Sequence, residues 1–455
     1  MSEGLHAMSD EDDRSPEDAL RDMLRDMLAG NAELDPQRLA GAAGLPSDPA
    51  SIQQLITQLQ GALRGNPDGS INWDLALQQG RQLAMSGSVE APPGQVSALQ
   101  QAFHVAELWL DEATGVGALT QTPALLSRGE WVKRTMPLWT QLAEPVANSI
   151  ADSLTKVMQE QAPEELQGML ANAGQMVRAV GGTLFAMQLG QVVGQLSTEV
   201  VSGGDIGIPL LEDGQAALLP QNVAVFGEGL DIGDDQVGLY LAVRELAHAR
   251  LFRHAKWLRL QVITAITEFA RGIRIDTERL EDVASSFDPA NPEELREVLA
   301  SGALIPPKTE AQEAALARLE TQLALIEGWV DVVTAAATSR LPKADAVAET
   351  VRRRRAAGGP AESAFATLVG LELRPRRLRE AAAMWQQVTD AVGAAKRDEL
   401  WSHPDLQPEA ADIDDPQRLI AKLNGTAPAD PELDALDRAL EDLLNDDSGD
   451  RPTEE

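Results

Sequence analysis

The sequence predicts a mainly α-helical protein, and three observations support that prediction. The chain has 455 residues, of which 44% are apolar, enough to bury a sizeable core. Aromatic residues make up only 4% of the chain, and Ala, Leu, Glu, Gln and Arg dominate, a mixture that favours helix. Apolar residues recur at helical spacing along most of the chain, whereas the Gly- and Pro-rich residues 202–232 break that pattern.

The charge of the chain is strongly negative and is concentrated at its two ends. The formal net charge is −33, and both ends are acidic and short of bulky apolar residues. We therefore divide the chain into an acidic N-terminal segment (1–45), one mainly helical body (46–425) and an acidic, disordered tail (426–455). A field of this sign repels nucleic acid and anionic membranes, so we expect neither as a partner. The sequence leaves the oligomeric state open.

Cysteine is absent, which excludes disulfides and thiolate metal ligands and is compatible with a reducing compartment. The N-terminus has neither a basic region nor an apolar core, so we expect no signal peptide. Spanning a bilayer takes about 18 apolar residues, and the longest candidate, residues 177–201, is interrupted by Arg, Gln and Glu. We therefore expect a cytoplasmic protein.

In the first half of the chain, amphipathic spacing predicts helices separated by short turns. Pro92 and Pro93 precede one of them, where the missing N–H of proline does no harm. Pro137 and Pro145 are expected to break or kink another. His104 lies between Phe103 and Val105, which favours a packed core histidine over a ligand. The expected helices are 18–28, 52–63, 73–84, 96–112, 128–161 and one within 163–200, with a loop at 119–127.

Residues 202–232 change character, and we expect one or two short strands there, with a β-prone run at 222–226. Helical spacing then resumes. Four arginines at 352–355 precede Gly358-Gly359-Pro360 and are interpreted as a helix end, where cations meet the C-terminal dipole favourably. The expected helices are 234–257, 258–273, 276–283, 292–301, 309–339, 365–392 and 415–423, with a proline-containing link at 401–412 that holds His403 as an exposed or capping residue.

The central helix carries the most informative motif, Arg244-Glu245-Leu-Ala-His248. A carboxylate and an imidazole three residues apart lie close together on one helical face. The pattern differs at one position from H-E-x-x-H, the helix on which zinc proteases hold their metal. The departure falls at the first histidine, which is arginine in this chain.

Several longer stretches together resemble the bacterial zincin-like metallopeptidase type 2 family of zinc-dependent metalloproteases. They are SRGEWVKRTMPLW (127–139), FAMQLGQVVGQL (185–196), SGGDIGIPL (202–210), RELAHARLFRHAKWL (244–258), ALIEGWVDVV (324–333), LVGLELRPRRLREAAAMW (368–385) and LWSHPDLQPEAADIDDP (400–416). The resemblance implies a multi-helical zincin-like core with one or two short strands. It also implies Zn²⁺ as cofactor, Glu245 as general base, His248 as a zinc ligand and Glu327, in the pair Glu327-Gly328, as a further ligand.

Whether this chain can bind a catalytic zinc depends on the residue at position 244. A catalytic zinc needs about three protein ligands and one open place for water. The intervening glutamate accepts a proton from the metal-bound water. Arg244 has no lone pair to give, and its guanidinium would place a positive charge where the metal should lie.

Three hypotheses remain open from the sequence. In the first, Arg244 replaces the metal and pairs with Glu327 or Glu245, leaving a metal-free site. In the second, zinc is still bound by His248, Glu327 and another residue, such as His254 or Asp331, and hydrolysis survives. His254 would reach the site only if the helix bent first, because six residues on a continuous helix lead to another face. In the third, Arg244, Glu245 and His248 form a structural ion-pair cluster in a scaffold that never worked as an enzyme.

Two functions follow from these hypotheses. One is a metal-assisted peptide or amide hydrolase with Glu245 as its base. The alternative is a catalytically inactive zincin-like pseudoenzyme that binds a peptide or a protein partner in the old cleft or acts as a scaffold. Metal content separates the two.

Overall fold

The computed structural model describes residues 71–161, 167–272, 308–356, 364–366, 368 and 377–426. The helices predicted at 18–28, 52–63, 276–283 and 292–301 lie outside these residues, as do the N-terminal segment 1–45 and the acidic tail. Within the described part the protein is mainly helical, as the sequence predicts.

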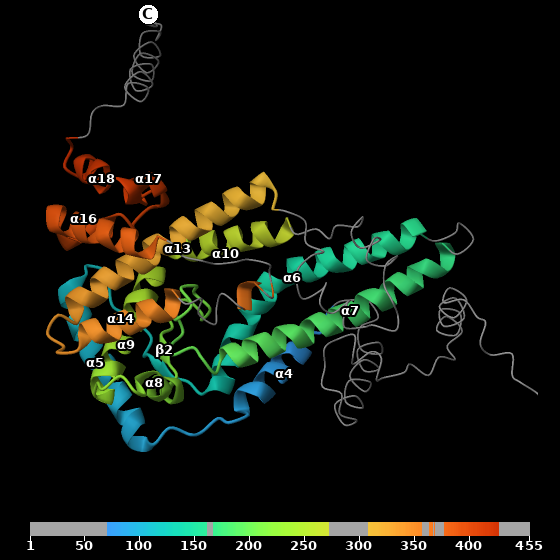
Figure 1. Ribbon diagram of the computed structural model, residues 1–455, viewed down its shortest axis with the longest axis horizontal. Helices are drawn as coiled ribbons and strands as arrows, with labels where there is room; N and C mark the ends of the chain where they lie inside the picture. The colour runs from blue at the N-terminus through green and yellow to red at the C-terminus, as the bar shows by residue number, and fades with distance from the viewer. Residues whose placement is uncertain are drawn as a thin grey trace, which may run out of the picture.

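Helices and two very short strands follow one another along the chain (Figure 1). In order they are α4 (Trp73–Met85), α5 (Pro93–Ala113), β1 (Ala124–Leu125), α6 (Arg128–Gln161), α7 (Gln167–Leu196), β2 (Ala217–Leu218), α8 (Pro220–Gly227), α9 (Asp234–His254), α10 (Lys256–Arg271), α13 (Glu310–Ala337), α14 (Ala344–Ala356), α16 (Leu378–Glu399), the 3₁₀ helix η2 (Pro404–Leu406), α17 (Ala410–Asp414) and α18 (Pro416–Leu423).

Helix α9 lies at the centre of the body. It packs against α5 and α13 and also contacts α8, α14 and β2. Helix α13 in turn packs against α10 and α16, so the two central helices connect the N-terminal and C-terminal parts of the body. Most of α9 is therefore buried, including its polar residues Arg244, Glu245 and His248.

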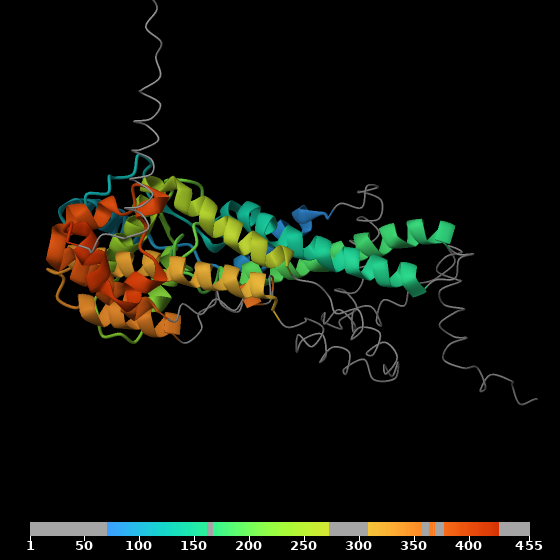
Figure 2. The ribbon, with the colours of Figure 1, turned by 90° about the horizontal axis from the view of Figure 1, so that it is seen from above.

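Helices α6 and α7 lie side by side and extend away from this body as a long helical arm (Figures 1 and 2). At the body end of the arm, α4 packs against both helices. Small residues allow that approach, because a Cβ added to Gly190 would lie 2.5 Å from the carbonyl oxygen of Ala76 in α4. The small residues of α7 therefore allow close packing against α4. None of the helices that the structure describes is long and apolar enough to cross a membrane.

The two strands form one short parallel ladder, in which Ala124 pairs with Ala217 and Leu125 with Leu218. Strand β2 lies within residues 202–232, where the sequence predicts one or two short strands, but two other expectations are wrong. Strand β1 lies within the predicted loop 119–127, and the β-prone run 222–226 belongs to helix α8. Pro220 begins that helix at a position where its fixed φ and missing N–H are favourable, which outweighs the local β propensity.

Other differences are local. Helix α6 continues through both Pro137 and Pro145, so of the expected break or kink the break does not occur. The expected helix 234–257 ends at His254, and α10 begins two residues later at Lys256. His104 is exposed on α5, so the expectation of a packed core histidine is wrong. The link 401–412 contains η2, which His403 caps by accepting a hydrogen bond from the N–H of Asp405, as expected for a capping residue.

Candidate functional site

The candidate site begins with three polar residues that α9 buries. The helix starts at Asp234 and Asp235, whose charges suit the N-terminal end of the dipole, and it ends with Arg253 and His254. Between these ends, Arg244 is 6% exposed, while Glu245 and His248 are each 3% exposed. Charged groups at this depth must be paired, since an isolated buried charge is very unfavourable.

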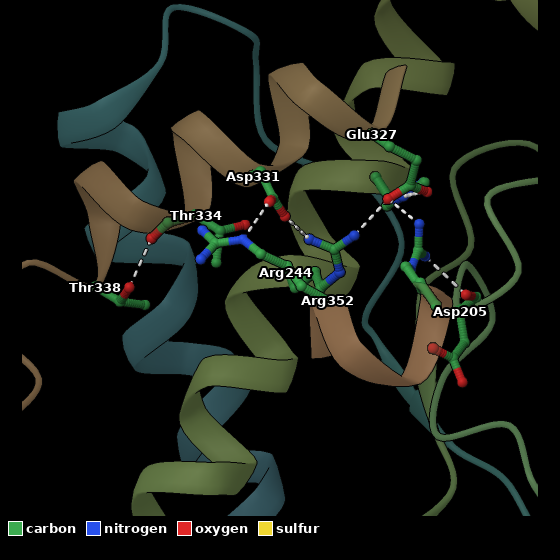
Figure 3. Close-up of polar contacts among 9 residues, drawn as sticks. Asp205, Arg244, Glu327, Asp331, Thr334, Thr338 and Arg352 are labelled. Atoms are coloured by element: carbon green, nitrogen blue, oxygen red, sulfur yellow. Dashed lines mark hydrogen bonds and ion pairs between the residues drawn. The ribbon is translucent and has the colours of Figure 1, made fainter. Parts of the chain in front are cut away.

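Glu327 on α13 is the partner of two of them. Its carboxylate accepts a hydrogen bond from Nη2 of Arg244, and its other oxygen, Oε1, lies 2.8 Å from Nε2 of His248. Asp331, one turn further along α13, lies 2.6 Å from Nη1 of Arg244. Figure 3 shows the guanidinium of Arg244 between these two carboxylates. Arg244 therefore pairs with Glu327 and not with Glu245.

Helix α14 contributes arginines from the run 352–355 to this ion-pair network. Nη1 of Arg355 forms an ion pair with Oε2 of Glu327, the oxygen that Arg244 also contacts. Nε of Arg352 lies 3.1 Å from Oδ2 of Asp331. Arg354 pairs at 3.1 Å with Asp205, which lies in the loop that follows α7. Three guanidinium groups therefore face the two carboxylates of α13.

Glu245 has other partners, two backbone N–H groups and the side chain of Ser202. One of its oxygens accepts the N–H of Gly204 at 2.8 Å, and the other accepts the N–H of Ala217 in β2 at 2.9 Å. The glycine-rich loop is needed for this approach. A Cβ on Gly204 would lie 3.1 Å from Glu245 Oε2, and Gly207, at φ +77°, would place one 2.9 Å from Glu327 Oε1.

These environments shift the pKa values of the two glutamates in opposite directions. Burial raises the pKa of Glu245, and its hydrogen bonds, first of all that from Ala217, oppose the shift only in part. Burial would also raise the pKa of Glu327, but attraction to Arg355, His248 and Arg244 outweighs it and holds that pKa well below its usual range. Burial would lower the pKa of Arg244, yet Glu327 and Asp331 raise it, so this guanidinium stays charged.

A comparison with known families shows which family the chain belongs to. The model of the zincin-like metallopeptidase family matches residues 71–420, which is most of the chain. The chain belongs to this family. No curated protein matches it.

A solved structure related to this family member supports the fold. It is the crystal structure of a proposed hydrolase with a novel fold from Chloroflexus aurantiacus. The two chains are 19% identical, with a TM-score of 0.54, and the similarity covers 78% of this chain and 99% of the other. At this identity the comparison establishes a common fold and carries no argument about activity.

Zinc is the metal that the family implies, and the residues present do not fit it. The motif resemblance would place the first ligand at position 244, where Arg244 has no lone pair to donate. The oxygens of Glu327 are already engaged by two guanidiniums and by His248. Among the described residues, no three His, Asp or Glu side chains are placed to hold a metal ion.

The structure brings together Arg244, His248, Glu327 and Asp331, and it places Glu245 beside them on separate partners. His254 is different, because it is exposed at the last position of α9 and contributes nothing to the cluster. The sequence interpretation missed Arg352, Arg355 and the backbone of Gly204. The four consecutive arginines were a visible signal, but their partners lie far away in sequence.

Proposed function

We propose that this protein is a metal-free, catalytically inactive member of the zincin-like family that acts as a binding or scaffold protein. The observation that carries the proposal is the engagement of Glu327 by Arg244, Arg355 and His248. The guanidinium of Arg244 supplies the positive charge that a metal ion would bring to this carboxylate. The buried charges are then compensated within the protein itself.

The same contacts argue against zinc-assisted hydrolysis, the other function that the sequence allows. A hydrolytic zinc centre needs ligands with free lone pairs and an open coordination position. Arg244 offers none, and His254, a candidate replacement, lies exposed at the end of α9. Glu245, the expected base, has each of its oxygens engaged by a backbone N–H, from Gly204 and from Ala217.

Zinc binding by the full chain tests this proposal. Wild-type protein dialysed against buffered zinc should retain no stoichiometric metal. The double variant Arg244→His/Arg355→Ala should gain zinc binding, because it restores the missing imidazole and frees one oxygen of Glu327. The single variant Arg353→Ala is the matched control, since Arg353 lies on the same helix α14 and its side chain is 76% exposed.

Two results would contradict the proposal. Stoichiometric zinc in the wild type that is lost in His248→Ala would overturn the proposal and restore the hydrolase hypothesis. Zinc binding that is absent from the folded double variant as well would show that the cluster is unrelated to a metal site.

A further inference from the structure

The ion-pair network around Glu327 holds more guanidinium groups than carboxylates. Arg244, Arg352 and Arg355 share only two of them, Glu327 and Asp331. All four oxygens of these carboxylates are engaged, three by guanidiniums and the fourth by an imidazole ring. The network therefore has one positive charge more than its carboxylates balance, and a charge that is shielded from water needs a partner.

The hydrogen bonds show the same shortage of acceptors. Nε of Arg355 is buried and has no hydrogen-bond partner among the described residues. The other two arginines of α14 do not change the balance, because each has a carboxylate of its own. Arg353 pairs with Glu349 at 2.9 Å, and Arg354 pairs with Asp205 at 3.1 Å. The excess of donors therefore belongs to the network around Glu327.

Arg352 is the member of the network that reaches solvent. Its side chain is 41% exposed, against 7% for Arg244 and 14% for Arg355. Only its Nε is engaged, at 3.1 Å from Asp331, and neither Nη1 nor Nη2 has a partner among the described residues. Arg352 and Arg244 approach Asp331 from two sides (Figure 3). Asp345, the remaining acid of α14, lies about 10 Å away along the helix axis. The free end of the guanidinium presents two N–H groups in the planar fork that binds two oxygens of a carboxylate or a phosphate.

From these contacts we infer that Arg352 binds an oxyanion of a polypeptide partner, a carboxylate or a phosphate group, through Nη1 and Nη2. The oxyanion supplies the missing negative charge at the exposed edge of the network. A chain with a formal net charge of −33 repels anions in general, so this local excess of guanidiniums sets the place where one binds. The inference rests on the proposed function and names the chemistry of the partner, because a metal on Glu327 would displace the contacts of Arg244 and Arg355.

The arginine Nε–Hε resonances of the full chain test the inference directly. The Arg352 signal is assigned by its absence from the spectrum of Arg352→Lys, and the Arg353 signal by its absence from that of Arg353→Lys. Sodium phosphate and sodium acetate should each shift the Arg352 signal to saturation, whereas sodium chloride at equal ionic strength should not. The Arg353 signal is the internal control, because that side chain is 76% exposed and pairs with Glu349. An Arg352 signal that responds to phosphate no more than to chloride, or no more than the Arg353 signal does, would overturn the inference.

The same two variants separate the planar fork from positive charge alone. Lysine keeps the charge but presents no fork, so Arg352→Lys should bind phosphate roughly tenfold more weakly than wild type. An anion that binds the native state raises the midpoint of thermal unfolding, and the general stabilising effect of phosphate is common to all variants. Relative to chloride, phosphate should therefore raise the midpoint of wild type and of Arg353→Lys more than that of Arg352→Lys. Equal responses of the two variants would place the anion elsewhere and overturn the assignment.

Two capped amino acids distinguish the sources of the oxyanion. Nα-acetyl-glutamate methylamide presents a side-chain carboxylate, and Nα-acetyl-phosphoserine methylamide presents a phosphate. The compound that shifts the Arg352 signal at the lower concentration identifies the group, and a response to neither overturns a polypeptide source. Zinc content is measured on the same samples. Zinc-free protein whose Arg352 signal ignores phosphate and acetate contradicts this inference alone, whereas stoichiometric zinc contradicts the proposed function as well.

Discussion

Arg244 and Glu327 form a buried ion pair across the contact between α9 and α13. The pair is not isolated, because Glu327 also contacts His248 and Arg355, and Arg244 also contacts Asp331. Each of these side chains loses its hydration on folding and regains its partners only within the network. Removing one member should therefore cost more than an exposed pair would.

Glu327→Ala is the most severe test of this network. It leaves Arg244 and Arg355 without the carboxylate that they share, so the free energy of unfolding should fall by about 3–5 kcal/mol. Glu327→Gln keeps the shape of the side chain and should lower the free energy of unfolding by less. Urea unfolding monitored by tryptophan fluorescence measures both changes. Glu349→Ala is the control, because Glu349 pairs only with exposed Arg353 on α14 in the described structure, and it should show no measurable loss. A loss for Glu327→Ala no larger than that of the control would contradict the account.

Arg355 is predicted to differ sharply from its neighbour Arg353, although both belong to the same run on α14. Arg355 is 14% exposed and contacts Glu327, whereas Arg353 is 76% exposed. Arg355→Ala should lower the free energy of unfolding by roughly 1.5–3 kcal/mol, because a buried charge-assisted contact is lost while Arg244 still compensates Glu327. Arg353→Ala should change it by less than about 0.5 kcal/mol. Thermal unfolding of the two variants should rank them in this order, and the reverse order would assign the arginine run another role.

The sequence predicts the helices of the described body well because their apolar period is long. Helix α13 at Glu310–Ala337 lies within two residues of its expected bounds at each end, and Glu327 does meet the face of Arg244 and His248. The strands could not be located in the same way. Two residues, such as Ala217–Leu218, carry no period, and their pairing with Ala124–Leu125 is decided by the packing of distant segments.

The sequence also could not predict which residues pair with the buried charged side chains. Arg244 and Glu245 are adjacent, but successive residues point about 100° apart on a helix, so they enter different networks. The burial of each arginine in 352–355 depends on how α14 packs against α9 and α13. Four identical residues in a row give no indication of it. The glycine loop was visible, but its hydrogen bond to Glu245 was not.

Gly328, next to Glu327, is predicted to be indispensable for the contact between α13 and α16. A Cβ there would lie 2.7 Å from the backbone nitrogen of Ala382 and 2.8 Å from the carbonyl carbon of Ala381. These are backbone atoms, so the helices must separate, and Gly328→Ala should cost about 1–3 kcal/mol despite the better helix propensity of alanine. Gly181→Ala on α7 meets no described heavy atom within 4 Å and should instead stabilise by roughly 0.5–1 kcal/mol. Denaturant midpoints that move in the same direction would refute the difference.

Gly207 and Gly87 form a matched pair for the glycine loop. Both have a positive φ, +77° and +76°, so alanine costs roughly 1–2 kcal/mol of backbone strain at either position. Only Gly207 lies against the network, since its added Cβ would be 2.9 Å from Glu327 Oε1, whereas no described heavy atom lies within 4 Å at Gly87. Gly207→Ala should therefore be less stable than Gly87→Ala by about 1 kcal/mol or more in urea unfolding. Equal losses would mean that the loop can withdraw from Glu327.

The two buried glutamates should give the stability opposite dependences on pH. The pKa of Glu327 is lowered in the folded protein by Arg355, His248 and Arg244, which outweigh its burial. Its contribution is therefore fully present above the unfolded pKa of about 4.5 and is lost as the pH falls toward the folded pKa. The pKa of Glu245 is raised by burial, so ionising it costs stability as the pH rises above about 4.5.

Unfolding free energies from pH 3 to pH 8 measure both effects against the Glu→Gln variants. The advantage of wild type over Glu327→Gln should be constant above about pH 5.5 and should shrink below pH 4.5. The advantage over Glu245→Gln should shrink as the pH rises, on top of a constant loss, because an amide cannot accept hydrogen bonds from both Gly204 and Ala217 with its two terminal atoms. Two curves with slopes of the same sign would contradict the opposite shifts of the pKa values of Glu245 and Glu327.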